Sequence, residues 1–235
     1  MRYSIDEVSE ADIRVLPGEC AFEQDHASAI AANWKRAQAA NPALFNGRVH
    51  LCAEAEIDGE SIRANLYQTQ FATLLYWRQQ PFGTGLRNTF GDVILRGCDG
   101  GILLGRMASD TANAGKICLP GGSFDDSDVN NGRIDPTICI RRECREETGF
   151  GPDRYTLDPQ MLVYRDDRRV AFARLARLTV SAAEARAEAL AFIATEDRPE
   201  LDDIIVVSSI DDADRLIPDT YERHLIAHLF RERTS

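Results

Sequence analysis

The stretch Arg142-Glu143-Cys144-Arg145-Glu146-Glu147-Thr148-Gly149-Phe150 decides how this chain is interpreted. Upstream of it, Asp135 is a good N-cap residue and Pro136 suits the first position of a helix. Gly149 is placed to end that helix in a left-handed conformation. We therefore predict a helix over residues 136–147.

Three carboxylates share one face of this predicted helix. Glu143, Glu146 and Glu147 stand at i, i+3 and i+4, and like charges at these spacings repel by a few tenths of a kcal/mol per exposed pair. A hard divalent cation such as Mg²⁺ or Mn²⁺ prefers oxygen ligands and offsets the repulsion. Arg142 can pair with Glu146 and orient the cluster. A solvated charged helix is the alternative reading of such a run taken alone.

The upstream context favours a site over a solvated helix. Residues 117–124 contain the segment Leu119-Pro120-Gly121-Gly122, and its Pro-Gly-Gly turn lies at the end of a predicted strand. A backbone without side chains at two successive positions can approach a metal ion or a phosphate closely.

Together these residues resemble the Nudix family. Its box reads G-x5-E-x7-R-E-U-x-E-E-x-G-U, where U is apolar. Gly122 matches the first glycine, and the residues from Arg142 to Phe150 match the second half, with Cys144 in an apolar position. The resemblance covers about residues 88–230.

The chain departs from the box at its first glutamate. Counting back from Arg142 places this glutamate at Ile134, whereas counting forward from Gly122 places it at Asp128. The intervening loop is about six residues longer than in the box. Two alternatives stay open for this loop. Either one of its acids takes the place of the missing glutamate, or the loop is simply solvated. The acids concerned are Asp125, Asp126 and Asp128.

The resemblance implies a fold and a set of site residues. The implied fold class is α/β, a Nudix α/β/α sandwich around a mixed sheet. The implied metal ligands for Mg²⁺ (or Mn²⁺) are Glu143, Glu146, Glu147 and the Gly122 carbonyl, and the implied catalytic residues are Glu143 and Arg142. The resemblance also implies a further acid from a later loop, for which Glu196, Glu200, Asp202 and Asp203 are candidates. Glu200 and Asp203 precede the apolar strand predicted over residues 204–207, where the family often carries such a residue, and they are assigned to substrate binding.

The chemistry that follows is hydrolysis of a diphosphate linkage. We expect a magnesium-dependent pyrophosphatase, a hydrolase of phosphoric anhydride bonds, that acts on a nucleoside diphosphate derivative. Glu143 serves as general base or as metal ligand, and these two roles stay open. The alternatives are a Nudix-fold sensor that binds a nucleotide metabolite without cleaving it, and an interaction protein that docks through its N-terminal region.

An N-terminal α+β lobe is expected over residues 1–80, and a Nudix hydrolase domain over residues 81–235. The segments Ala32-Asn33-Trp34 and Asn41 to Gly47 loosely resemble a Nudix subgroup that hydrolyses UDP-glucose, which favours a nucleotide sugar as substrate. Arg87, at the entry to the first Nudix strand, is a candidate for binding substrate phosphate on its position alone.

Composition limits the other partners. A formal net charge of −11 disfavours nucleic acid polymers and anionic membranes, although a bound cation would reverse the local sign. No apolar run approaches the roughly 18 residues of a membrane span, and the polar N-terminus does not read as a secretory signal. The six cysteines form no CxxC pair. We therefore expect a cytoplasmic protein with a small-molecule nucleotide substrate, for which a homodimer is an open option.

Overall fold

The computed structural model describes residues 3–81 and 83–232. It has the predicted α/β composition, with helices and a mixed sheet. The chain divides into two compact units, each made of three separate stretches. Unit 1 comprises the chain up to Gly91, Gly122–Cys139 and Gln160–Phe172, and unit 2 comprises Asp92–Gly121, Ile140–Pro159 and the chain from Ala173 onward. The expected division, by contrast, cuts the chain once near residue 80 into two continuous parts, and it stays a prediction.

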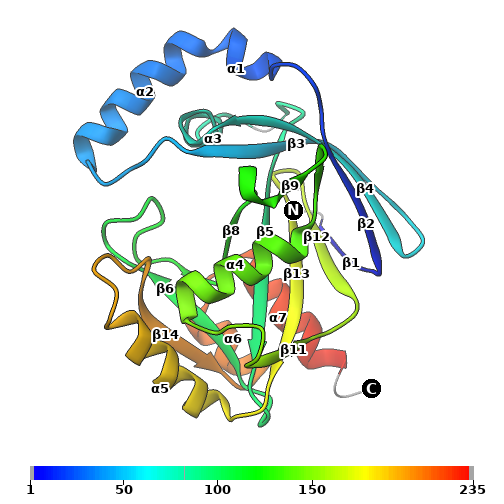
Figure 1. The fold of residues 1–235 in the computed structure, drawn as a ribbon, viewed down its shortest axis with the longest axis vertical. Helices are drawn as coiled ribbons and strands as arrows, with labels where there is room; N and C mark the ends of the chain where they lie inside the picture. Colours follow the sequence, from blue (N-terminus) through cyan, green and yellow to red (C-terminus); the bar gives the residue numbers. More distant parts are fainter. Residues whose placement is uncertain (1–2, 82, 233–235) are drawn as a thin grey trace. The chain divides into compact units, whose positions relative to one another are not determined.

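Unit 1 is built around a long hairpin. Alternating residues predict this hairpin over residues 49–68, and the structure has it between β3 (Arg48–Asp58) and β4 (Ser61–Gln70), with Gly59 at a φ of 61° in the turn (Figure 1). β2 (Glu10–Val15) runs parallel to β4, so the sheet is mixed. The other strands and helices of this unit are β1 (Ser4–Val8), β9 (Val129–Asn130), β10 (Arg133–Ile134), β12 (Met161–Arg165), α1 (Ala21–Asp25), α2 (Ala27–Ala40), α3 (Phe71–Trp77) and the short 3-10 helix η1 (Asp126–Asp128).

Good helix formers and apolar residues at helical spacing predict one helix over residues 21–39. This prediction was wrong, because the structure has two helices there. His26 separates α1 from α2 with φ −114° and ψ 13°, outside the helical range. Its Nδ1 lies 2.9 Å from the Phe22 carbonyl oxygen, and its ring stacks on the Phe22 ring at 4.4 Å. A side chain that bonds a nearby carbonyl competes with the helical hydrogen-bond pattern.

Residues 92–95 and 102–104 flank the turn Cys98-Asp99-Gly100-Gly101 and predict a second hairpin, which the structure contains in unit 2. β5 (Arg87–Arg96), whose first residues belong to unit 1, pairs with β6 (Ile102–Met107) so that Leu95 faces Leu103. β14 (Leu201–Val207) lies on the other edge of β6, antiparallel to it. The remaining elements are β7 (Ile117–Cys118), β11 (Tyr155–Leu157), α5 (Ala182–Ile193), α6 (Ile210–Leu216) and α7 (Tyr221–Glu232), while β8 (Gly121–Ser123), α4 (Pro136–Thr148) and β13 (Arg169–Leu178) contain residues of both units.

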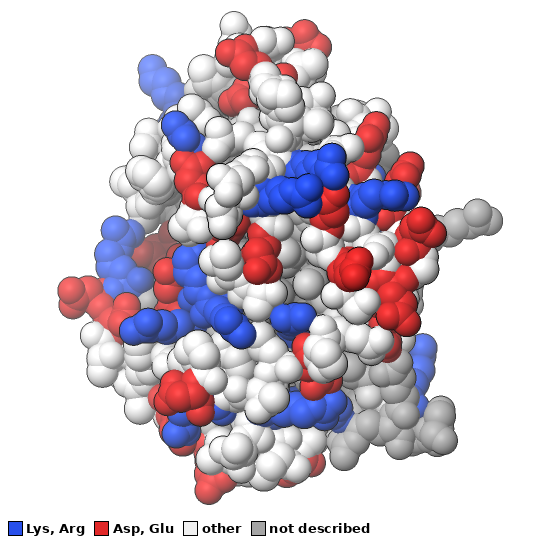
Figure 2. All heavy atoms as spheres, turned by 45° about the vertical axis from the view of Figure 1, so that its right-hand side comes forward, with Lys and Arg blue, Asp and Glu red and all other residues white. Residues whose placement is uncertain are grey.

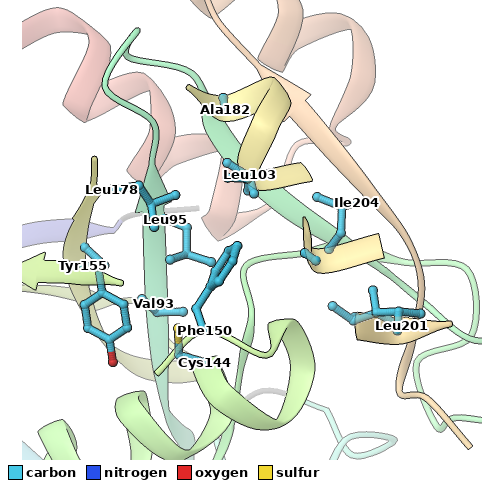
Figure 3. Packing of buried hydrophobic residues seen from close by; sticks show 14 of the residues in the cluster. Val93, Leu95, Leu103, Cys144, Phe150, Tyr155, Leu178, Ala182, Leu201 and Ile204 are labelled. Carbon is cyan, nitrogen blue, oxygen red and sulfur yellow. The ribbon is translucent and has the colours of Figure 1, made fainter. Parts of the chain in front are cut away.

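The apolar core of unit 2 fixes the second half of α4. Ile140 and Cys144, the apolar stripe predicted for this helix, are fully buried and pack with Val93 and Leu95 of β5. Figure 3 shows the Phe150 ring among these residues, directly beyond the end of the helix. Burying each such side chain contributes about 1.5–3 kcal/mol, so the opposite face of α4 is held in a defined orientation.

In the part of the chain that the structure describes, no helix is long and apolar enough to cross a membrane. All six cysteines are free thiols. The face in Figure 2 carries basic and acidic side chains interleaved with one another.

Candidate functional site

The candidate site lies on α4 in unit 2. The helix spans Pro136–Thr148, one residue beyond the predicted end. Asp135 Oδ1 accepts a hydrogen bond from the Thr137 backbone N–H at 2.8 Å, as a capping residue does. Gly149 follows with a φ of 76° and donates its N–H to the Arg145 carbonyl at 2.9 Å. The start and the end of the helix are therefore confirmed.

Arg142 holds two of the three helix carboxylates. Its Nη1 lies 2.6 Å from Glu143 Oε1 and 3.3 Å from Glu146 Oε2. Glu143 is buried, whereas the side chain of Glu146 is 60% exposed. The predicted pairing of Arg142 with Glu146 is present, and Glu143 shares the same guanidinium.

Glu147 is fixed by the glycine turn. Gly121 donates its backbone N–H to Glu147 Oε2 at 2.9 Å, and Pro120 is held against β5 because its carbonyl accepts the Val93 N–H at 2.8 Å. The glycine turn therefore places a backbone donor at the carboxylate cluster. Glu147 is 4% exposed, so this bond satisfies one oxygen of a nearly buried group.

Glu200 belongs to the same cluster. It directly precedes β14, and its carbonyl accepts the Ala108 N–H at 2.8 Å, which anchors it beyond the end of β6. Burial, followed by the charge of Glu146, raises the pKa of the Glu200 carboxyl. Of the expected later acids, Glu200 is the one that the structure brings to the helix carboxylates.

Burial and mutual repulsion disfavour the charged forms of this cluster. Burial raises the pKa of Glu143 to about 7, although Arg142 acts in the opposite direction. Burial, together with the charges of Glu143 and Glu200, raises the pKa of Glu147 well above its usual range. A cation placed among these groups would lower their pKa values, since an opposite charge favours ionised carboxylates.

Asp92 was not singled out by sequence reasoning, yet it lies near this cluster. It is 2% exposed, accepts a hydrogen bond from the Tyr221 hydroxyl at 3.0 Å, and contributes to the raised pKa of Glu147. In sequence, an isolated aspartate at the middle of a strand carries no signal for a site, and its proximity depends on the pairing of β5 with distant segments.

The remaining predicted site residues are Asp203, Arg87 and Gly122. Asp203 is paired with Arg186 at 3.0 Å and with Arg106 at 3.5 Å. Arg87 and Gly122 belong to unit 1, where the Gly122 carbonyl is 3.4 Å from the Cys139 Sγ that donates to it. Their assigned roles stay predictions.

The acidic loop after Gly122 has its own structural partners. Asp125 caps η1 by accepting the Ser127 N–H, and the buried Asp128 side chain accepts the Asp125 N–H in return. Asp126 binds Arg48 at 2.8 Å and the Gln68 side chain at 2.6 Å. These contacts account for the three aspartates within unit 1.

Unit 1 also contains a polar pocket of about 430 Å³. Carboxylate, amide and hydroxyl groups from the first helices and from the β3–β4 hairpin line it, namely Glu19, Glu23, Gln24, Ala27, Arg48, Gln68, Thr69 and Gln70.

The donor set fits a hard divalent cation in its chemistry, since it consists of carboxylate oxygens. Within the described ranges, no three His, Cys, Asp or Glu side chains are grouped as a metal site requires. In this structure, Glu143 and Glu146 form ion pairs with Arg142.

Comparison with solved structures finds several Nudix proteins of low sequence identity. The MutT protein of Methanosarcina mazei Go1 is 18% identical, with 63% of this chain and 96% of that chain covered and a TM-score of 0.43. A Caenorhabditis elegans (C. elegans) Ap4A hydrolase in a binary complex is 15% identical, with 62% and 97% covered and a TM-score of 0.43. The NUDIX domain of Shewanella oneidensis NrtR, crystallised with ADP ribose, is 15% identical, with 68% and 97% covered and a TM-score of 0.39.

No curated protein matches the chain. The family model of the NUDIX domain matches residues 86–226, which is more than half of the sequence and includes α4, Gly122 and Glu200. The chain therefore belongs to the Nudix family and is a Nudix hydrolase.

Proposed function

We propose that this chain is a magnesium-dependent pyrophosphohydrolase that cleaves the diphosphate linkage of a nucleoside diphosphate derivative, with a nucleotide sugar as the preferred class. The observation that carries the proposal is the carboxylate cluster of α4, in which Arg142 holds Glu143 and Glu146 while Gly121 holds Glu147. The loose resemblance of residues 32–47 to a UDP-glucose-hydrolysing subgroup supports the choice of a sugar.

Glu143, Glu146, Glu147 and Glu200 would hold the cation, with the Gly122 carbonyl as a further predicted ligand. A bound divalent cation supplies positive charge that draws electron density from the phosphate oxygens. Because Arg142 already contacts Glu143 and Glu146, we expect the exposed Glu146 side chain to leave Arg142 when the cation binds.

The reaction itself is an in-line displacement at phosphorus. A water molecule attacks one phosphorus atom, the bond from that phosphorus to the bridging oxygen breaks, and two phosphate monoesters result. Glu143 takes the proton of the attacking water or, in the alternative role, holds the cation. Arg142 orients Glu143 in either role, because the two groups are in direct contact.

Turnover with a substrate panel tests the activity. The protein is incubated with Mg²⁺ and, in separate reactions, nucleotide sugars, ADP-ribose, dinucleoside polyphosphates and NADH, and the released monophosphate is measured. We expect turnover to be highest with a nucleotide sugar and to disappear when EDTA removes the metal. Absence of turnover with every compound would favour the sensor alternative.

Glu146→Gln tests the site. This variant should lose metal-dependent turnover by a factor of 100 or more, on the order of a lost catalytic group, because it removes a charged ligand. The fold should survive, since the Glu146 side chain is mostly exposed. Glu188→Gln is the matched control, an exposed helix glutamate that also pairs with an arginine, Arg154. Equal activity of Glu146→Gln and Glu188→Gln would disprove the site assignment.

A further inference from the structure

The polar pocket of unit 1 has two walls that hydrogen bonds hold in place. One wall is the strand pair β3–β4, in which Arg48 lies directly opposite Gln70 (Figure 1). Gln68 lies two residues before Gln70, so these three side chains share one face of the strand pair. The other wall is α1 with the start of α2. Glu23 of α1 fixes this wall, because its Oε1 accepts the Thr73 hydroxyl of α3 at 2.8 Å.

The acidic loop after Gly122 supports the strand wall. Asp126 Oδ2 accepts a hydrogen bond from Arg48 Nη1 at 2.8 Å, and its Oδ1 accepts one from Gln68 Nε2 at 2.6 Å. One carboxylate therefore orients two side chains of the pocket. Among the described residues, Arg48 Nε and Nη2 and Gln68 Oε1 make no hydrogen bond, so these atoms are available to a ligand.

The other polar side chains of the pocket also keep unused hydrogen-bonding atoms. Asn46 donates to Gln70 Oε1 at 2.7 Å, which leaves the Gln70 amide nitrogen as a donor. Gln24 donates to Oε2 of Glu19. Within the part of the chain that the structure describes, Glu19 Oε1 and Glu23 Oε2 accept no hydrogen bond. The pocket therefore presents donors and acceptors together.

This combination decides between classes of ligand. A phosphate group mainly accepts hydrogen bonds and is repelled by the two carboxylates, whereas an ammonium group only donates and is repelled by the guanidinium. A hydroxyl group donates and accepts. The described lining contains no aromatic ring on which a nucleobase could stack. The volume of about 430 Å³ lies within the roughly 300–1,000 Å³ of small-molecule sites. The lining therefore fits a small ligand with several hydroxyl groups.

We propose that this pocket binds a sugar. The sugar hydroxyls donate to the carboxylates of Glu19 and Glu23 and accept from the Arg48 guanidinium and the Gln70 amide. The sugar is either part of the substrate of the proposed hydrolysis or a free sugar that binds as a separate ligand. Only the first source rests on the proposed function.

Binding of free sugars tests the pocket while the catalytic cluster is without metal. Saturation-transfer NMR and titration calorimetry are carried out on the full chain in EDTA with glucose, galactose and ribose in turn, and with inorganic phosphate and ethanolamine as comparison compounds. We expect at least one of the three sugars to bind, and to bind more tightly than either comparison compound. Binding of no sugar, or equal or tighter binding of phosphate or ethanolamine, would overturn the proposal.

Two alanine variants locate the bound sugar. Ala27 lines the pocket at the start of α2, and Ala29 is an exposed alanine of the same helix that points to a different side. Ala27→Phe should bind the sugar roughly tenfold more weakly or worse, because its ring fills the pocket, whereas Ala29→Phe should bind like the wild type. Both should unfold at the wild-type temperature, since neither alanine is buried. Equal sugar affinity of the two variants would overturn the proposal.

Glu23→Gln tests the recognition chemistry. Its amide oxygen can still accept the Thr73 hydroxyl, but the variant lacks the charge that strengthens a hydrogen bond from a sugar. Sugar binding should weaken about tenfold with little change in Tm. Glu54→Gln is the matched control, an exposed glutamate of unit 1 that also accepts a side-chain hydrogen bond, from Asn65 at 3.2 Å. Unchanged sugar binding by Glu23→Gln would contradict the assigned recognition.

Competition and kinetics distinguish the two sources of the sugar. If the substrate supplies it, UDP-glucose in EDTA displaces the bound free sugar, and Ala27→Phe raises KM about tenfold with little change in kcat. If a separate ligand supplies it, the free sugar stays bound at saturating UDP-glucose and KM is unchanged. Glu146→Gln should bind sugars like the wild type in EDTA, so a failure of the proposed hydrolysis leaves the sugar-binding result interpretable on its own.

Discussion

His50 is a buried imidazole whose environment resists protonation. It has no exposed surface, and its Nδ1 lies 2.9 Å from the Phe124 carbonyl oxygen. Burial lowers the pKa of His50, against the opposing effect of the Phe124 carbonyl and of the nearby aspartates. The folded protein therefore binds this proton less readily than the unfolded chain does.

The contribution of His50 to stability should consequently fall as the pH drops below about 6.5, the ordinary pKa of histidine, whereas Glu143, whose pKa is raised to about 7, contributes in the opposite direction. Above that pH both states are neutral at His50 and no stability is lost, whereas below it the unfolded state takes up the proton first. Urea unfolding at pH 7.5 and 5.5 measures the difference. His50→Asn, whose amide can still donate to Phe124, removes only the His50 contribution, so acidification from pH 7.5 to 5.5 should be less unfavourable to this variant than to the wild type; an equal change in both proteins would contradict this account.

At the level of single residues, the sequence predicted what depends on local spacing. The helical positions of Glu143, Glu146 and Glu147 and the pairing of Arg142 with Glu146 follow from residues a turn apart. Glu200 was predicted only as one of several acids, because its proximity depends on the pairing of β14 with β6. Their roles in metal binding and catalysis remain predictions.

At the level of elements, α4 and the two hairpins were predicted because their signals are local. Capping residues mark the helix, and turn residues between alternating apolar positions mark the hairpins. The break at His26 depends on one ring bonding to Phe22, and the strand β11, which pairs with β13, depends on a distant partner. Neither appears in a hydrophobic pattern. The helix α6, capped by Ser209, was also missed, since its run of seven residues is too short to display a period.

The end of α4 makes a testable prediction. A Cβ on Gly149 would lie 2.6 Å from the Phe192 ring, and the φ of 76° disfavours any L side chain. Gly149→Ala should therefore destabilise the protein by roughly 2–4 kcal/mol, the sum of backbone strain and a core clash. Gly115→Ala is the matched control, with a φ of 73° and no atom within 4 Å, and should cost only about 1–2 kcal/mol. Thermal unfolding compares them; equal costs would mean that Phe192 moves aside.

At the level of the whole molecule, each compact unit draws on distant parts of the chain. The core of unit 1 joins Ile13 to Phe124 and Ile134 from the second stretch and to Val163 and Phe172 from the third. Such long-range associations have no signature in local sequence, so the division near residue 80 was predicted from a local signal, the interruption of the pattern by Pro81, Gly83 and Gly85.

Ile13→Ala tests whether these stretches form one unit. Ile13 is 1% exposed, and its truncation should cost about 2–5 kcal/mol. Hydrogen exchange followed by mass spectrometry should then show faster exchange not only around β2 but also across 122–139 and 160–172. Ile138→Ala is the control, because that isoleucine is 42% exposed. Faster exchange confined to residues near Ile13 would contradict a single cooperative unit.

The pairing of β1 with β12 has a consequence for synthesis on the ribosome. Val8 pairs with Met161, so about 150 residues must be translated before the first strand meets its partner. At about 5–20 residues per second, this interval lasts roughly 10 to 30 seconds. Throughout it, the edge of β1 and the side chain of Val8 lack their final contacts with β12. β1 is therefore exposed to chaperones and to aggregation for a long part of synthesis.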